Sequence, residues 1–79
     1  MRVVDARGHR CPTPTLKLAR ALREAAPGEE LELLATDPMA RIDVPHFLAQ
    51  GGHALVFTET RQDGVLAFRV TRSSSAPTG

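Results

Sequence analysis

The chain has 79 residues, 42% of them apolar, and a net charge of +1, which suits one globular domain with a modest core. The near-neutral charge argues against a direct nucleic-acid partner, and no apolar run approaches the ~18 residues that a membrane-spanning helix needs. The N-terminus lacks the apolar stretch of a signal peptide and the only cysteine cannot form an internal disulfide, so we expect a cytoplasmic protein without a membrane partner.

The first part of the chain predicts a strand, a helix and a second strand. Residues 2–5 are β-prone, and a loop around Gly8 separates them from a helical pattern over residues 12–26. The apolar stripe of this helix consists of Leu18, Ala21, Leu22 and Ala25. Pro27 and Gly28 end the helix, and residues 30–36 alternate like a half-buried strand. The inward-facing residues of that strand are predicted to be Leu31, Leu33 and Ala35.

The next segment predicts a second helix that contains a proline. Asp37 is a suitable N-cap and Pro38 a suitable first helical residue, whereas Pro45 would interrupt a continuous helix. Either a short turn over residues 38–43 precedes a second start capped by Asp43, or one helix bends near Pro45. In both cases the residues expected to face the core are Met39, Ile42, Phe47 and Leu48.

Two further strands form a predicted hairpin. Residues 53–60 and 65–72 alternate in hydrophobicity, and the Asp-Gly pair at positions 63–64 is a strong tight-turn signal between them. The residues placed on one face are Leu55 and Phe57 in the first strand, and Leu66, Phe68 and Val70 in the second. Residues 73–79 are rich in serine, proline and glycine, which predicts a disordered tail after a domain of residues 1–72.

The element order is therefore βαβαββ. The first βαβ unit should be parallel with a right-handed crossover. Two helices cannot cover both faces of a four-stranded sheet, so both should pack on one face. The predicted fold is a two-layer α/β sandwich, with a four-stranded mixed sheet and two helices on one face.

The segment that points to chemistry lies between the first strand and the first helix. Cys11 stands at the predicted helix N-terminus, and Pro12 occupies a favoured first-turn position. The positive end of the helix dipole, together with Arg7 and Arg10, should lower the thiol pKa of Cys11 and favour an anionic sulfur. The same two arginines could contact an acidic partner. A lone cysteine is often a buried small hydrophobe, but this one is surrounded by polar and basic residues.

Other chemistries find little support in the sequence. His9 is interpreted as an exposed loop residue and not as a proton-transfer group near Cys11. One cysteine and three scattered histidines do not supply a metal site, and no cofactor motif is present. A thiol redox function is weakened by the absence of a second, resolving cysteine.

Residues 5–14 resemble a known family signature. They read Asp-Ala-Arg-Gly-His-Arg-Cys-Pro-Thr-Pro and are similar to the Asp-x-x-Gly-x-x-Cys-Pro-x-Pro signature of the TusA/SirA-like sulfur-carrier family. The Asp-Pro pair at 37–38, Asp-Val-Pro at 43–45 and Gly-His at 52–53 extend the resemblance over about residues 3–72. Family members have a βαβαββ fold. The chain departs from the usual pattern at His9 and Thr15. Because both positions flank the cysteine, these departures bear on which partner protein binds there and leave the cysteine chemistry unchanged.

The resemblance implies a sulfurtransferase that carries sulfane sulfur as a persulfide on Cys11. Gly8, Pro12 and Pro14 would shape the site. A cysteine desulfurase or a rhodanese would be the sulfur donor, and the acceptor would be a protein of tRNA thiolation, molybdenum cofactor assembly or sulfur oxidation. The alternative is a non-catalytic RNA- or protein-binding module of the same fold, since a fold alone does not determine a function.

Overall fold

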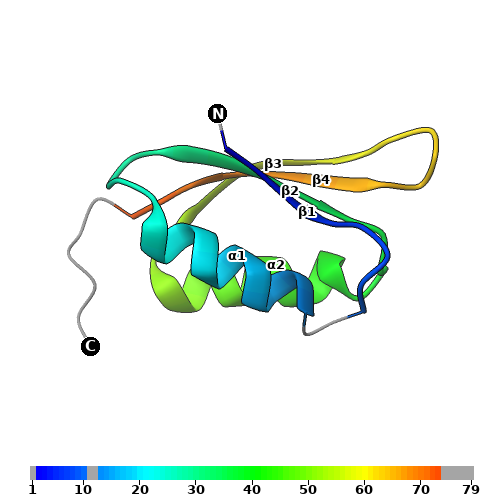
Figure 1. The fold of residues 1–79 in the computed structure, drawn as a ribbon, viewed down its shortest axis with the longest axis horizontal. Coiled ribbons are helices and arrows are strands. Elements are labelled where there is room, and N and C mark those ends of the chain that lie inside the picture. Colours follow the sequence, from blue (N-terminus) through cyan, green and yellow to red (C-terminus); the bar gives the residue numbers. More distant parts are fainter. Residues whose placement is uncertain (1, 11–12, 74–79) are drawn as a thin grey trace.

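A computed structural model describes residues 2–10 and 13–73, which form a sheet and a layer of two helices (Figure 1). The strands are β1 (Arg2–Ala6), β2 (Glu30–Ala35), β3 (Ala54–Thr60) and β4 (Leu66–Thr71). The helices are α1 (Thr13–Glu24) and α2 (Ala40–Gly51), and both lie on the same face of the sheet. The predicted βαβαββ order and the two-layer α/β architecture are confirmed.

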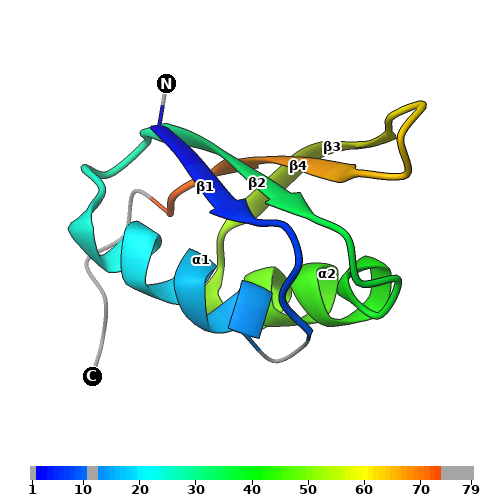
Figure 2. The ribbon, with the colours of Figure 1, turned by 45° about the vertical axis from the view of Figure 1, so that its right-hand side comes forward.

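The four strands are arranged in the order β1-β2-β4-β3. β1 and β2 are parallel, with Val4 opposite Leu33, whereas β4 runs antiparallel to both of its neighbours. Because β1 and β2 are parallel, the loops that leave their carboxyl ends lie at the same end of the molecule, where both helices begin (Figure 2). This end of the molecule contains the cysteine segment.

The core between the sheet and the helices follows the predicted pattern. In α1, Leu18 and Leu22 are buried, and β2 directs the predicted Leu31, Leu33 and Ala35 into the same core. From β4 the core receives Leu66, Phe68 and Val70. Burial of such large side chains is the main stabilising contribution in a domain of this size.

In α2, two of the predicted core residues are exposed. Met39 is 50% exposed and Ile42 is 65% exposed, so these two predictions are wrong. Leu48 is buried and Phe47 packs partly against the core, as predicted. The buried stripe consists of Ala40, Val44 and Leu48, which are spaced four residues apart. The small Ala40 side chain, and not the larger Met39 or Ile42, therefore faces the sheet.

The segment around Pro45 is a single helix and not a turn followed by a second start. α2 is continuous from Ala40 to Gly51 with Pro45 inside it, and Asp43 lies in its first turn. The predicted N-cap Asp37 and first helical residue Pro38 are wrong, because Met39 is the N-cap and the helix begins at Ala40. Asp37 Oδ1 accepts a hydrogen bond from the Met39 backbone N–H at 3.0 Å, in the turn that precedes the helix. Pro45 removes one backbone donor, but packing of the buried stripe keeps the helix continuous.

β3 contains a register shift between Leu55 and Phe57, which explains another difference from the prediction. The irregularity places Phe57 opposite Arg69, away from the core side on which Leu55 packs. Phe57 is 42% exposed, and the Arg69 guanidinium lies 5.1 Å from the centre of its ring. The predicted alternation is thus correct for Leu55 and wrong for Phe57.

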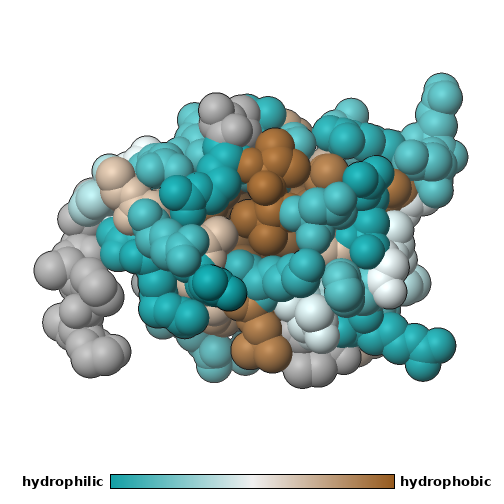
Figure 3. Space-filling view, viewed as in Figure 1, coloured by the Kyte–Doolittle hydropathy of each residue, from teal (hydrophilic) through white to brown (hydrophobic). Residues whose placement is uncertain are grey.

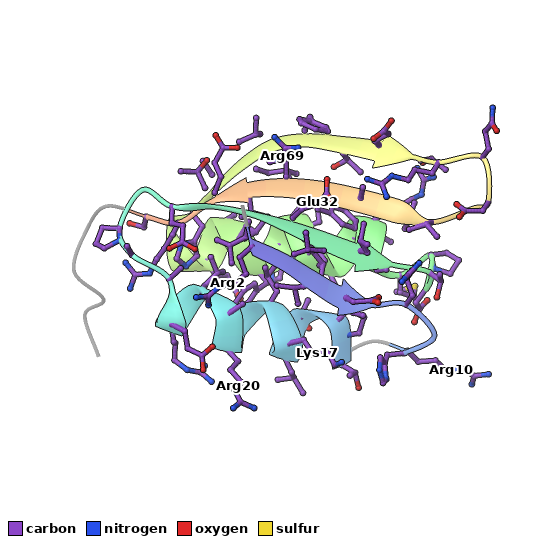
Figure 4. All side chains as sticks on the ribbon, turned by 45° about the horizontal axis from the view of Figure 1, so that its top comes forward. Arg2, Arg10, Lys17, Arg20, Glu32 and Arg69 are labelled. Carbon is purple, nitrogen blue, oxygen red and sulfur yellow. The ribbon has the colours of Figure 1, made fainter. Side chains whose placement is uncertain are left out.

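The sheet face opposite the helices carries charged side chains. Arg69 of β4 pairs with Glu30 at 3.4 Å and with Glu32 at 3.7 Å, both on β2. Figure 4 shows Arg69 and Glu32 on neighbouring strands of this face. A small apolar cluster of Leu34, Val65 and Ala67 lies on the same face, next to these pairs along the strands. The charges on this face are therefore largely compensated within the chain.

The end of α1 is held by a buried arginine. The Arg72 Nε donates to the Leu22 carbonyl at 2.6 Å, and Arg72 is only 9% exposed. Next to it, the Ser73 backbone N–H donates to His53 Nδ1 at 2.9 Å. Ser73 thus contacts the folded domain, while residues 74–79 lie outside the described residues and the predicted tail boundary stays a prediction. Within residues 2–10 and 13–73, no helix is long and apolar enough to cross a membrane.

Candidate functional site

The cysteine segment connects β1 to α1. Cys11 and Pro12 lie outside the described residues, so the predictions for these two positions are not tested. The chain is placed on both sides of them, and the Thr13 backbone N–H donates to the Arg10 carbonyl at 2.9 Å. This bond closes a turn of the chain, and α1 begins at Thr13. Pro14, predicted to shape the site, is fully buried in the first turn of that helix.

Gly8 makes the turn that follows β1. Its φ is +83°, in the left-handed region that a residue with a Cβ rarely adopts. The His9 N–H donates back to the Ala6 carbonyl at 3.2 Å, and the Gly8 N–H donates to Thr36 Oγ1 at 2.9 Å. Thr36 directly follows β2, so this hydrogen bond joins the loops after the two parallel strands. Gly8 thus forms the turn at the start of the loop, and its role in shaping the site stays a prediction. Thr36 is a contact that the sequence analysis missed.

Asp5 and Arg7 form a two-point ion pair at the start of the loop. Arg7 Nε lies 2.9 Å from Asp5 Oδ1 and Nη2 lies 2.8 Å from Oδ2. The Arg7 backbone N–H also donates to Asp5 Oδ1 at 3.1 Å. The side-chain and backbone hydrogen bonds from Arg7 hold the pKa of Asp5 well below its usual range, and Asp5 in turn raises the pKa of Arg7. Asp5 therefore partly neutralises the charge of Arg7, so Arg7 should contribute less than an unpaired arginine to stabilising a thiolate at Cys11.

Several cations remain along this side of the molecule. Lys17 Nζ donates to the Asp5 carbonyl at 3.3 Å, which holds it beside the loop, and Arg10 is exposed next to the cysteine position. Figure 4 shows Arg10, Lys17 and Arg20 along one side, from the loop into α1. We define the basic face of α1 as the exposed residues Arg10, Lys17, Arg20 and Arg23.

The basic face surrounds one exposed apolar side chain. Leu16, on the first turns of α1, is 63% exposed. The space-filling view shows mostly hydrophilic residues over α1, with a small apolar spot at its lower edge (Figure 3). Glu24, the acidic residue of α1, pairs with Arg20 at 3.5 Å and with Arg2 at 3.6 Å. A partner with an acidic surface and an apolar contact would match this composition.

The histidine of the loop and the metal-ligating side chains are the other candidate groups. His9 is exposed on the loop, as predicted, and its part in the chemistry stays a prediction. In the described part of the chain, no three metal-ligating side chains come together in a group that could hold an ion.

Comparisons with known proteins agree with the predicted family and with the fold. The family described as sulfurtransferase TusA matches residues 2–72. A protein of Archaeoglobus fulgidus whose name describes a sulfur carrier is 41% identical over 70 residues, which cover 89% of this chain and 91% of that protein. The sulfur carrier protein TusA of Pseudomonas paraeruginosa is 44% identical over 54 residues, 68% of each chain.

A solved structure supports the architecture independently. The SirA-like protein of Desulfitobacterium hafniense superposes with a TM-score of 0.82 at 22% identity and covers 92% of this chain and 99% of that one. At this identity the likeness concerns the fold alone. The match of the family to residues 2–72, together with relatives above 40% identity, establishes the wider relationship. The chain belongs to the TusA family of sulfurtransferases.

Proposed function

We propose that this chain is a cytoplasmic sulfur carrier that holds sulfane sulfur as a persulfide on Cys11 and relays it from a donor protein to an acceptor protein. The observation that carries the proposal is the family match over residues 2–72, which includes the Cys-Pro-x-Pro segment with the only cysteine of the chain. A domain with a single thiol has no resolving partner for disulfide chemistry but can accept and return one sulfur atom.

The transfer needs no oxidant or reductant from outside. The Cys11 thiolate attacks the terminal sulfur of the donor persulfide and forms a new S–S bond. The S–S bond to the donor cysteine breaks, and that cysteine leaves as a thiolate. The same exchange with an acceptor thiolate returns Cys11 to its starting state. Arg10 and the amide groups at the start of α1 would favour the anionic sulfur in both states.

The loading of Cys11 is tested by intact mass. Incubation with cysteine and a cysteine desulfurase, or with thiosulfate and a rhodanese, should add the mass of one sulfur atom, and reductant should remove it. Cys11→Ser should stay unloaded while its denaturant melt stays within about 1 kcal/mol of wild type, because a serine at a helix start can act as a cap. Wild type that acquires no sulfur from either donor would contradict the carrier function. Wild-type binding to a partner in that case would favour the binding-module alternative.

We further propose that the donor docks on the basic face of α1. The basic face begins beside the cysteine segment with Arg10 and Lys17 and continues along α1 to Arg23 in its last turn. A partner that covers this face would bring its sulfur to the cysteine segment. Arg23→Glu should slow sulfur loading several-fold and reduce the dependence of the loading rate on salt. The reason is that a charge at the edge of a protein–protein interface mainly changes the rate at which the two partners associate. Arg61→Glu on the β3–β4 turn makes the same change of charge far from α1 and serves as the control. Equal slowing by both variants would exclude a specific role for this face.

A further inference from the structure

The hydrogen bond between Thr36 and Gly8 joins two loops that are distant in the sequence. Thr36 follows β2, and its hydroxyl oxygen accepts the Gly8 N–H at 2.9 Å. The register of the parallel strands brings them together, because Ala6 at the end of β1 pairs with Ala35 at the end of β2. The chain runs two residues beyond β1 to reach Gly8 and one residue beyond β2 to reach Thr36.

The same contact fixes one end of the cysteine segment. The left-handed backbone of Gly8, with a φ of +83°, directs its N–H to Thr36, while the other end is closed by the bond from Thr13 N–H to the Arg10 carbonyl at 2.9 Å. Cys11 lies in the sequence between these two anchors. On the Gly8 side, the backbone bond from the His9 N–H to the Ala6 carbonyl lies within the same loop, whereas the bond to Thr36 joins this loop to the one that follows β2.

We infer that Thr36 is a positioning residue for sulfur transfer, which acts through Gly8 on the segment that carries Cys11; this inference rests on the proposed function. Without the hydroxyl, the Gly8 N–H loses this partner and the link between the two loops is lost. The thiolate fraction of Cys11 and the rate of sulfur transfer should then fall. A net hydrogen bond of this kind shifts a conformational equilibrium by about fivefold.

The test compares Thr36→Val, Thr36→Ser and the control Thr58→Val on the exposed strand β3. Valine keeps the shape of threonine and removes the hydroxyl, whereas serine keeps the hydroxyl. The first measurement is the rate of Cys11 alkylation by iodoacetamide as a function of pH. The second is the rate of persulfide loading by a cysteine desulfurase, and a thermal melt of each variant monitors folding.

For Thr36→Val we expect a higher alkylation midpoint and loading that is about fivefold slower, because loss of one net hydrogen bond has this size. Thr36→Ser and Thr58→Val should behave like wild type. A wild-type profile for Thr36→Val, or an equal loss in Thr36→Ser, would overturn the inference. Alkylation needs no sulfur donor, so failure of wild type to load sulfur would contradict the proposed function and leave the alkylation comparison decisive for Thr36.

Discussion

Replacement of Arg72 by methionine tests how the C-terminal end of α1 is stabilised. Arg72 Nε donates to the Leu22 carbonyl at 2.6 Å, and Nη1 donates to the Ser73 carbonyl at 3.2 Å. Leu22 belongs to the last turn of α1, where carbonyl groups lack partners within the helix and the dipole favours a cation. Methionine keeps an apolar stem of similar length and removes the charge and both donors.

The structure sets the expected size of this effect. A hydrogen bond from a charged donor contributes about 1.5–3 kcal/mol, and a cation at a helix C-terminus adds about 0.3–1 kcal/mol. Arg72 is only 9% exposed, so solvent screens little of this, but relief of the buried charge offsets part of it. Arg72→Met should therefore lower the free energy of unfolding by about 2–3 kcal/mol in urea melts.

Arg69→Met on the same strand is the matched control. The Arg69 side chain is 26% exposed and pairs with Glu30 at 3.4 Å, a type of contact that contributes about 0–1 kcal/mol. Among the described residues its Nε is a buried donor with no hydrogen-bond partner, so methionine also removes an unsatisfied group. Arg69→Met should therefore lose no more than about 1 kcal/mol. If Arg72→Met lost no more stability than Arg69→Met, the stabilising role of the hydrogen bond to the Leu22 carbonyl would be refuted.

Two further predictions concern titration. Burial, and then the charge of Arg72, lower the pKa of His53 in the folded protein. As the pH falls below ~6.5, the His53 imidazole is therefore protonated in the unfolded chain at a higher pH than in the folded chain. The free energy of unfolding should therefore fall from about pH 7.5 to about pH 5.5, a slope that His53→Asn should flatten and the exposed-site control His46→Asn should leave intact. The thiol pKa of Cys11 should lie below ~8.5, and Arg10→Gln should raise it more than Arg7→Gln, because Asp5 pairs with Arg7 at 2.8 Å. An ultraviolet thiolate titration that gives equal shifts for both variants would contradict this ranking.

The sheet and α1 could be predicted because their local patterns and their packing agree. Leu18 and Leu22 form a helical stripe, and Leu31 and Leu33 alternate, so each element has one apolar side to bury. In α2 the apolar residues surround the helix, and period alone does not select the buried side. The residue that packs against the sheet is the small Ala40, which is buried, and not Ile42. Hydropathy alone would predict the opposite, because isoleucine is more hydrophobic than alanine.

The site was predicted only in part, because its geometry depends on contacts between distant residues. The resemblance of residues 5–14 to the family identified Cys11 without any information on the fold. The contact of Thr36 with Gly8 requires that β1 and β2 be parallel and in one particular register, which a local motif does not specify. The register shift that exposes Phe57 has the same origin, since it depends on pairing with β4.

The central position of β4 has a consequence for synthesis on the ribosome. β2 and β3 do not pair with each other, and each is hydrogen-bonded to β4, with Leu33 opposite Phe68 and Leu55 opposite Val70. A nascent chain that ends before β4 can form only the β1–β2 pair, and a two-stranded sheet is marginal in water. Folding must therefore wait until β4 has left the exit tunnel, and until then the apolar faces of α1 and β2 stay available to chaperones.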